Sequence, residues 1–151
     1  MPDLDDSDEA FAGEGSFPED EGFAFLTIEQ VNELHDEGIR QYTPTESLAI
    51  LNYGLLESAV MVPQQTWEGA FLYQSLTEMA AAYLIGLNQN HAYENGNKRV
   101  ALAACSTFLR MNGFQLSLTQ DEAVDLTLRI ARHELEREEV VAILNGAIAP
   151  L

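Results

Sequence analysis

Three capping boxes, each followed by apolar residues at helical spacing, constrain this chain more than any other feature of its sequence. In each box a Ser or Thr stands three residues before a Gln or Glu: Thr27 with Gln30, Ser75 with Glu78, and Thr119 with Glu122. The two side chains of such a box satisfy backbone N–H groups at the start of a helix. Apolar residues follow at spacings of three and four, the pattern of a helix with one buried face. The boxes therefore predict helix starts at three separate points.

Apolar residues recur at helical spacing in further stretches, which brings the expected number of helices to about six. Pro63 should end the second helix, and Asn112 with Gly113 supplies a left-handed stop for the fourth. Residues 114–118 should form a short extended piece. The expected helices cover approximately residues 27–42, 53–62, 75–89, 97–111, 119–133 and 136–148. The pattern therefore predicts an all-α, compact bundle without an internal repeat.

Residues 91–99 read His-Ala-Tyr-Glu-Asn-Gly-Asn-Lys-Arg and lead directly into the fourth helix. The first N–H groups of a helix have no partner within it, and the helix dipole adds partial positive charge, so such a start binds anions. Gly96 lets the backbone approach a phosphate, and Asn97 is able to cap the helix or to donate to a phosphate oxygen. Lys98, the only lysine of the chain, and Arg99 add full charges. A phosphate site is the interpretation that we favour over a solvated helix start.

His91 leads into this stretch and is the candidate catalytic residue. A free imidazole has a pKa of about 6.5, so it readily takes a proton from a hydroxyl group that attacks a bound phosphate. That property suits a phosphoryl or nucleotidyl transfer; a structural histidine is the alternative. His35, on or beside the buried face of the first helix, is interpreted as structural, and His133 only ends the fifth helix.

Residues 91–99 resemble the motif of the Fic/Doc superfamily in its death-on-curing (Doc) branch, H-x-F-x-[D/N]-[A/G]-N-K-R. The matching positions are His91, Asn95, Gly96, Asn97, Lys98 and Arg99, and Tyr93 replaces the family's phenylalanine conservatively. The resemblance extends over roughly residues 25–148. It implies the Fic/Doc fold for residues 25–151, with Tyr93 beneath the loop and residues 64–74 as a β-hairpin-like flap that pairs with extended backbone of a target protein. Packing of the flap aromatics onto the core is the alternative.

The Doc branch implies a toxin of a toxin–antitoxin pair that transfers a phosphoryl group from ATP to a hydroxyl of a translation factor, elongation factor Tu. Its partners would be that protein substrate and an antitoxin. AMP-transferring relatives usually carry Gly where this chain has Lys98 and a second Arg where it has Leu102. Both departures favour the kinase over an AMP or other nucleotidyl transferase. A catalytically inactive Fic fold kept as a binding module is a further alternative.

Asn95 motivates that last alternative. Many Fic/Doc relatives place an acid at this position to bind Mg²⁺, and an amide oxygen is a poorer ligand for a hard cation. The resemblance therefore implies Asn95 as the metal-binding position, with Mg²⁺ as a possible cofactor and with a reduced or altered dependence on it.

The net charge of −18 comes from 25 acidic residues against seven basic ones. Residues 1–24 hold nine of these acids and no base, and they read as an acidic, disordered tail. Sixteen acids against seven bases remain, so the domain is acidic as well. Such a chain repels nucleic acid and anionic membranes, and neither is an expected partner. The dispersed acids and single lysine favour a halophilic protein over one that attracts a basic partner.

No apolar run approaches the roughly eighteen residues of a transmembrane helix, and the acidic N-terminus does not resemble a secretory signal. The single cysteine, Cys105, excludes an internal disulfide and fits a reducing compartment. Its place in an apolar helical pattern predicts a small core residue and not a nucleophile. We therefore expect a soluble, cytoplasmic protein.

Overall fold

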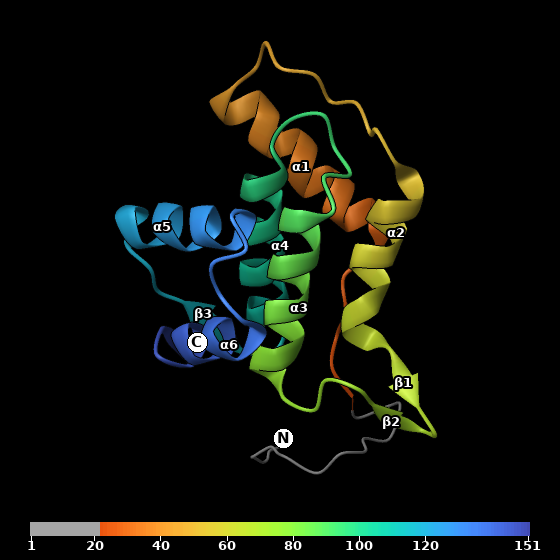
Figure 1. The fold of residues 1–151 in the computed structure, drawn as a ribbon, viewed down its shortest axis with the longest axis vertical. Coiled ribbons are helices and arrows are strands. Elements are labelled where there is room, and N and C mark those ends of the chain that lie inside the picture. The colour runs from red at the N-terminus through yellow and green to blue at the C-terminus, as the bar shows by residue number, and fades with distance from the viewer. Residues whose placement is uncertain (1–21) are drawn as a thin grey trace.

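The computed structural model describes residues 22–151, and six α-helices account for most of this part of the chain (Figure 1). The helices are α1 (Ile28–Tyr42), α2 (Tyr53–Met61), α3 (Leu76–Gln89), α4 (Asn97–Met111), α5 (Gln120–Ala131) and α6 (Arg137–Asn145). A short 3-10 helix, η2 (Val62–Gln64), follows α2 and contains Pro63. This mainly α-helical architecture confirms the predicted fold class.

Helices α3 and α4 form the centre of the bundle, where they pack against each other more extensively than any other pair of elements. In Figure 1 they run side by side, with α2 on one side and α5 and α6 on the other. Ala80 and Ala81 of α3 are fully buried in this core. The rings of Tyr83 and Phe108 meet in the core with centroids 5.1 Å apart. Cys105 is buried on α4, as predicted.

The three predicted capping boxes are all present. Thr27 Oγ1 accepts the Gln30 N–H at 3.1 Å, and Gln30 Oε1 accepts the Thr27 N–H at 2.8 Å. Ser75 with Glu78 and Thr119 with Glu122 make the same reciprocal pairs. At the start of α6, Glu139 also accepts the Glu136 N–H, at 2.7 Å. The local sequence thus determines where most of these helices begin.

Two short antiparallel strand pairs complete the described part of the fold. The strands are β1 (Thr66–Trp67) with β2 (Ala70–Phe71), and β3 (Phe114–Leu116) with β4 (Ile148–Pro150). The first pair lies within the predicted flap, and β3 lies within the predicted extended piece. The second pair corrects one expectation, because the last helix ends at Asn145 and Ile148 lies opposite Leu116 in the sheet. Gly146 disfavours another helical turn, Pro150 would interrupt it, and β3 offers this segment a partner.

Residues 1–21, most of the predicted tail, lie outside the described residues. The residues that follow contact the domain. The Ala24 N–H donates to Asn112 Oδ1 at 2.9 Å, and the Ala24 carbonyl accepts from Asn112 Nδ2 at 3.0 Å. The Phe23 ring lies against those of Phe25 and Phe71, with centroids 6.4 and 6.2 Å away. Contact with the domain therefore includes Phe23 and Ala24, which precede the predicted boundary at residue 25.

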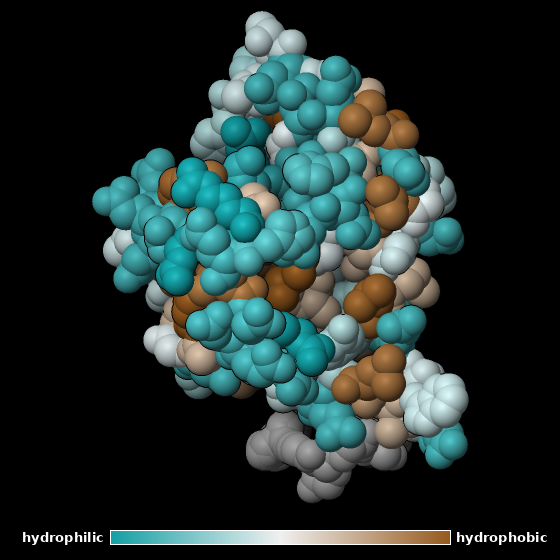
Figure 2. All heavy atoms as spheres, viewed as in Figure 1, coloured by the Kyte–Doolittle hydropathy of each residue, from teal (hydrophilic) through white to brown (hydrophobic). Residues whose placement is uncertain are grey.

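Exposed apolar side chains gather along the connector between α1 and α2 and along α2 itself. We call this surface the apolar ridge; its members are Leu48, Ile50, Leu51, Tyr53, Leu55 and Met61, each between 38% and 64% exposed. Figure 2 shows brown patches down the side on which Figure 1 draws the connector and α2. Within residues 22–151, no helix is long and apolar enough to cross a membrane.

Candidate active site

The loop between α3 and α4 carries the motif, and in Figure 1 it arches over one end of the central helix pair. Its backbone is bonded to the connector that follows α1. The Ala92 carbonyl accepts the N–H groups of Leu51 and Asn52 at 2.7 and 3.1 Å, and the Glu94 N–H donates to the Ala49 carbonyl at 3.0 Å. These bonds fix the first half of the loop against a segment about forty residues earlier in the chain.

Tyr93 anchors the loop from within, as predicted. Its side chain is 1% exposed, and its hydroxyl donates to Asn32 Oδ1 of α1. Burial, and then the negative charge of Asp36, raise the pKa of the Tyr93 hydroxyl, so it remains a neutral donor. Tyr93 is therefore a structural residue of the site and not a proton carrier.

Asn97 closes the loop on itself. Its Oδ1 accepts the Tyr93 N–H at 3.1 Å, and its Nδ2 donates to the Tyr93 carbonyl at 2.8 Å. The prediction gave this side chain a role in capping the helix or holding a phosphate. In the structure, one oxygen and one N–H of the amide are bonded to the loop backbone, so Asn97 shapes the site from inside.

His91 stands at the start of the loop with an exposed side chain and a left-handed backbone, φ +51°. Such a conformation is uncommon for a residue other than glycine and persists where the surroundings hold it. The neighbours on both sides do so: Asn90 Nδ2 donates to the Leu55 carbonyl at 3.0 Å, and the Ala92 carbonyl accepts the two bonds described above. The His91 ring has no hydrogen-bond partner within residues 22–151. Its backbone is thus fixed while its imidazole is available for proton transfer.

The second half of the loop ends at an open helix start. Gly96 precedes α4 with φ +81°, and no side chain caps this helix. The first helical bond of α4 runs from the Val100 N–H to the Gly96 carbonyl, so the N–H groups of residues 97–99 precede the helical ladder. Lys98 is exposed beside them. Three N–H groups, a helix dipole and a free ammonium group make this end of the loop attractive to an anion.

Arg99 lies apart from this open surface. Its guanidinium sits over the Tyr42 ring, 5.2 Å from the centroid, and Nη1 donates to Thr43 Oγ1 at 3.4 Å. The end of α1 thus holds the arginine that was predicted to bind phosphate alongside Lys98. In the described conformation Lys98 alone provides a full positive charge at the helix start.

Asn95, the predicted metal position, is half-buried, and its carbonyl accepts from His35 Nε2 at 2.7 Å. No group of three or more His, Cys, Asp or Glu side chains suited to a metal ion occurs within residues 22–151. Glu94, the adjacent acid, is exposed. The loop thus offers a metal ion an amide oxygen at Asn95 and no assembled cluster of acidic ligands.

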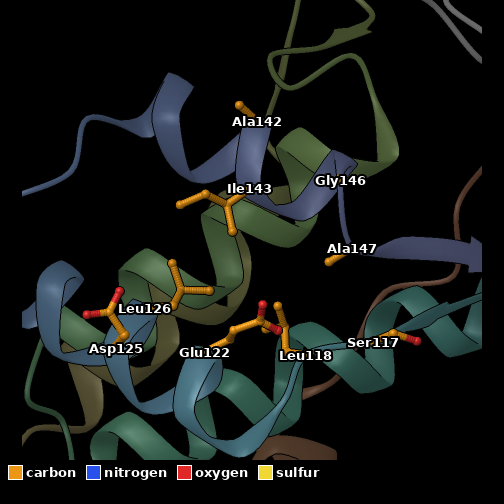
Figure 3. Close-up of a pocket in the computed structure, with 9 residues that line it drawn as sticks. All are labelled: Ser117, Leu118, Glu122, Asp125, Leu126, Ala142, Ile143, Gly146 and Ala147. Atoms are coloured by element: carbon orange, nitrogen blue, oxygen red, sulfur yellow. The ribbon is translucent and has the colours of Figure 1, made fainter.

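Two shallow cavities lie elsewhere in the described structure. Figure 3 shows the larger, about 310 Å³, between α5, α6 and the segment after β3, with Glu122 and Asp125 at an otherwise mainly apolar lining. The smaller, about 180 Å³, is lined in part by Asn90, Tyr73 and Arg137. Neither of these two cavities is lined by His91 or by a residue of the α4 start.

The fold and this loop define the class of protein: the chain belongs to the Fic/DOC family, whose model matches residues 25–109 and so includes the whole motif. The chain is 42% identical to Toxin Doc of Mycolicibacterium smegmatis over 104 residues, which are 68% of this chain and 80% of that protein. It is 30% identical to Protein kinase doc of Escherichia phage P1 over 127 residues, which are 80% of this chain and 92% of the phage protein.

Proposed function

We propose that the protein is a Doc-type toxin of a toxin–antitoxin pair. It transfers the γ-phosphoryl group of ATP to a hydroxyl group of a translation factor similar to elongation factor Tu, in the cytoplasm. The observation that carries the proposal is the motif loop, which fixes a free imidazole, His91, at one end and an uncapped helix start with Lys98 at the other. The names of the two Doc relatives support the toxin and kinase parts.

In the proposed reaction, His91 accepts the proton of a Ser, Thr or Tyr hydroxyl of the target. The hydroxyl oxygen attacks the γ-phosphorus as its O–H bond breaks, and the bond between that phosphorus and the β,γ-bridging oxygen breaks in turn. ADP leaves with the bonding electron pair, and the target carries a phosphate ester. The N–H groups of residues 97–99 and the Lys98 ammonium hold phosphate oxygens and stabilise the charge of the transition state.

The composition of α4 favours phosphoryl over nucleotidyl transfer. Leu102 packs partly against the core, and the next cation of the helix after Arg99 is Arg110, in its last turn. The nucleotide therefore meets positive charge only at the first turn of the helix, which is sufficient for the outer phosphates. A second cation further along α4, such as AMP-transferring relatives carry, has no counterpart here.

In this proposal a metal ion would bind only together with ATP. Mg²⁺ is usually held by one or two carboxylates together with phosphate oxygens and water. The loop offers Asn95 Oδ1, an amide oxygen, so the donor set fits Mg²⁺ poorly, and we derive no step through a metal. We expect a weaker dependence of the reaction on Mg²⁺ than a carboxylate at this position would give.

The decisive experiment determines which phosphate group of ATP is transferred to the target. The protein is incubated at high salt with a purified elongation factor Tu and with ATP labelled at either the α- or the γ-phosphate, and the target is then weighed by mass spectrometry. We expect label only from the γ-position, a mass gain of one HPO₃ group, and no transfer by His91→Ala. Label from the α-position would identify a nucleotidyl transferase, and failure of every such assay would favour a binding module.

His133→Ala is the matched control for that experiment. His133 is exposed, and its backbone is also left-handed, at φ +58°. Like His91→Ala, the substitution His133→Ala removes an exposed imidazole from a residue with a left-handed backbone, but it leaves the motif loop unchanged. Transfer should be unchanged in this variant.

The antitoxin partner is the second element of the proposal, and the apolar ridge supports it. The ridge lies on the connector whose backbone holds the motif loop, so a partner bound there would lie next to His91. Residues 41–97 contain no Lys or Arg, whereas Glu46 and Glu57 are exposed along the ridge. A segment with an apolar face and basic flanks would fit this surface. Co-expression with the product of a small neighbouring gene should restore growth, and Leu51→Asp should prevent that rescue.

A further inference from the structure

His35 is a buried histidine of α1 that reaches the motif loop from sixty residues earlier in the chain. It is 2% exposed. Its ring stacks on Tyr93 with centroids 3.7 Å apart and an angle of 10° between the ring planes. Its two nitrogens lie 2.7 Å from the Asn95 carbonyl oxygen and 3.2 Å from Asp36 Oδ1. The His35 side chain thus contacts the loop at two residues, Tyr93 through its ring face and Asn95 through Nε2.

The hydrogen-bond partners of the His35 ring define the role of each ring nitrogen. A carbonyl oxygen only accepts hydrogen bonds, so Nε2 of His35 must be a donor to Asn95. On the other side of the ring, a carboxylate oxygen of Asp36 lies 3.2 Å from Nδ1. Asp36 therefore orients the imidazole so that Nε2 faces the loop.

The contact falls where the loop becomes the helix. Asn95 immediately precedes Gly96, the left-handed residue from which α4 starts. A Cβ atom at Gly96 would lie 3.1 Å from Ile39 Cδ1 and 3.5 Å from the His35 ring, so the backbone rests directly on α1 here. The connector residues 49–52 hold the other half of the loop, next to His91. The two halves thus have separate anchors.

We propose that His35 is a positioning residue, which fixes Asn95, Gly96 and the open start of α4 in the orientation that binds the nucleotide phosphates. Asp36 assists by orienting the imidazole. The inference rests on the proposed function in one respect, because it assigns the anion at the α4 start to ATP. It separates the residues that set nucleotide affinity, near His35, from those that place the catalytic His91.

The test compares His35 with Asn88, a second buried side chain that donates a hydrogen bond to a backbone carbonyl. His35→Leu keeps the apolar contact with Tyr93 and removes the donor, whereas His35→Gln keeps an N–H of similar reach. Asn88→Leu is the matched control, because Asn88 is 1% exposed and lies in the last turn of α3, where its side chain donates to the Thr127 carbonyl of α5 at 3.0 Å and not to the motif loop. ATP affinity is measured by calorimetry and thermal stability is measured on the same samples, in high salt.

We expect His35→Leu to weaken ATP binding about tenfold, His35→Gln to stay within about threefold of wild type, and Asn88→Leu to leave the affinity unchanged. Hydrogen exchange at the amides of residues 95–99 should accelerate in His35→Leu and not in Asn88→Leu. Equal losses of affinity in His35→Leu and Asn88→Leu, or none in either, would overturn the positioning role. If His35→Leu does not fold, Asp36→Asn must weaken ATP binding and accelerate that exchange; otherwise the role is also overturned.

The exchange measurement keeps this inference separable from the proposed function. A wild-type protein that binds no ATP would refute the proposed function, and exchange at residues 95–99 would still report whether His35 fixes the loop. A wild-type protein that binds ATP but loses nothing in His35→Leu would refute only the positioning role.

Discussion

The Asn97 side chain bonds both backbone groups of Tyr93, through Oδ1 at 3.1 Å and Nδ2 at 2.8 Å. The clamp holds the loop backbone at the same residue whose ring is buried beneath it. Asn112 makes a comparable clamp elsewhere, on the N–H and carbonyl of Ala24. Asn112 Nδ2 also donates to the Phe108 carbonyl at 2.8 Å. These two asparagines thus clamp backbone in a similar way, one inside the motif and one remote from it.

This pair allows a controlled substitution. Asn97→Ala removes two side-chain bonds to backbone and Asn112→Ala removes three, and each should lower the free energy of unfolding by about 1–2 kcal/mol. Only Asn97→Ala frees the motif loop, so only this variant should lose most of its transfer activity. Chemical unfolding and the labelled-ATP assay measure the two quantities. Equal activity in both variants would remove Asn97 from the site.

Gly96→Ala should cost more stability than Gly113→Ala. Both glycines are left-handed, at φ +81° and +96°, so an alanine is strained at either position. At Gly113 the new Cβ meets nothing within 4 Å, whereas at Gly96 it lies 3.1 Å from Ile39 Cδ1. We expect a loss of about 1 kcal/mol at Gly113 and about 2–3 kcal/mol at Gly96, together with weaker ATP binding at Gly96 only.

The helices were predictable because their signals are local. A capping box such as Thr27 with Gln30 lies within four residues, and both partners act through the backbone of the same turn. The pairing of Ile148 with Leu116 depends on residues that are thirty-two positions apart. The apolar Ile148 fits a helical period and a strand equally well, and only the presence of β3 decides between them.

The candidate site likewise has one part that local sequence predicts and another that depends on distant elements. Residues 91–99 are contiguous, so the proposed catalytic histidine and the helix start were visible as one motif. The anchors come from distant elements: Asn32 and His35 from α1, and residues 49–52 from the connector. The place of His35 on the buried face of α1 predicts a structural residue, but nothing in the sequence connects it with Asn95. The contact of Arg99 with Tyr42 was not predictable for the same reason.

Cys105 should be unreactive in the folded protein. Burial raises the pKa of its thiol to about 12, so little thiolate forms near pH 8.5, and the side chain has no solvent access. Iodoacetamide should therefore label the native protein at the rate of unfolding, and label it quickly in urea. Since this is the only cysteine, mass spectrometry reads the modification without ambiguity. Fast labelling under native conditions would contradict the buried position.

Alkaline pH should destabilise the fold. Burial raises the pKa of Tyr83 from 10.0 to about 12, although its hydroxyl accepts the Leu26 N–H at 2.9 Å. The folded state then holds a proton that the unfolded state releases, so stability is complete below pH 10 and falls as pH rises toward 12. The slope for this one group is about 1.4 kcal/mol per pH unit. Unfolding in urea at pH 9, 10 and 11 measures it, and Tyr83→Phe should show a shallower slope.

Low salt should also destabilise the fold. Between arginine or lysine and acidic side chains of residues 22–151, the ion pairs are Arg129 with Asp125 at 3.7 Å and Arg137 with Glu138 at 3.8 Å. Most of the acids thus lack a cationic partner, and their repulsion is screened only by added ions. We expect the melting temperature to rise steadily as KCl increases from 0.05 to about 1 M, over which the screening length falls several-fold. A melting temperature indifferent to KCl would remove the halophilic interpretation.

The exposed side of α1 allows that repulsion to be tested at a single residue. Glu29, Glu33 and Glu37 are all exposed and four residues apart, so Glu33 faces a like charge on the preceding and on the following turn. Glu33→Lys replaces two repulsive pairs by two attractive ones and should stabilise the protein by about 0.5–1 kcal/mol at low salt. Glu33→Gln, which only removes the charge, should give about half of that gain. Because both effects are electrostatic and solvent-exposed, they should largely vanish at about 1 M KCl. A gain that persists at high salt would instead point to the helix propensity or packing of the new side chain.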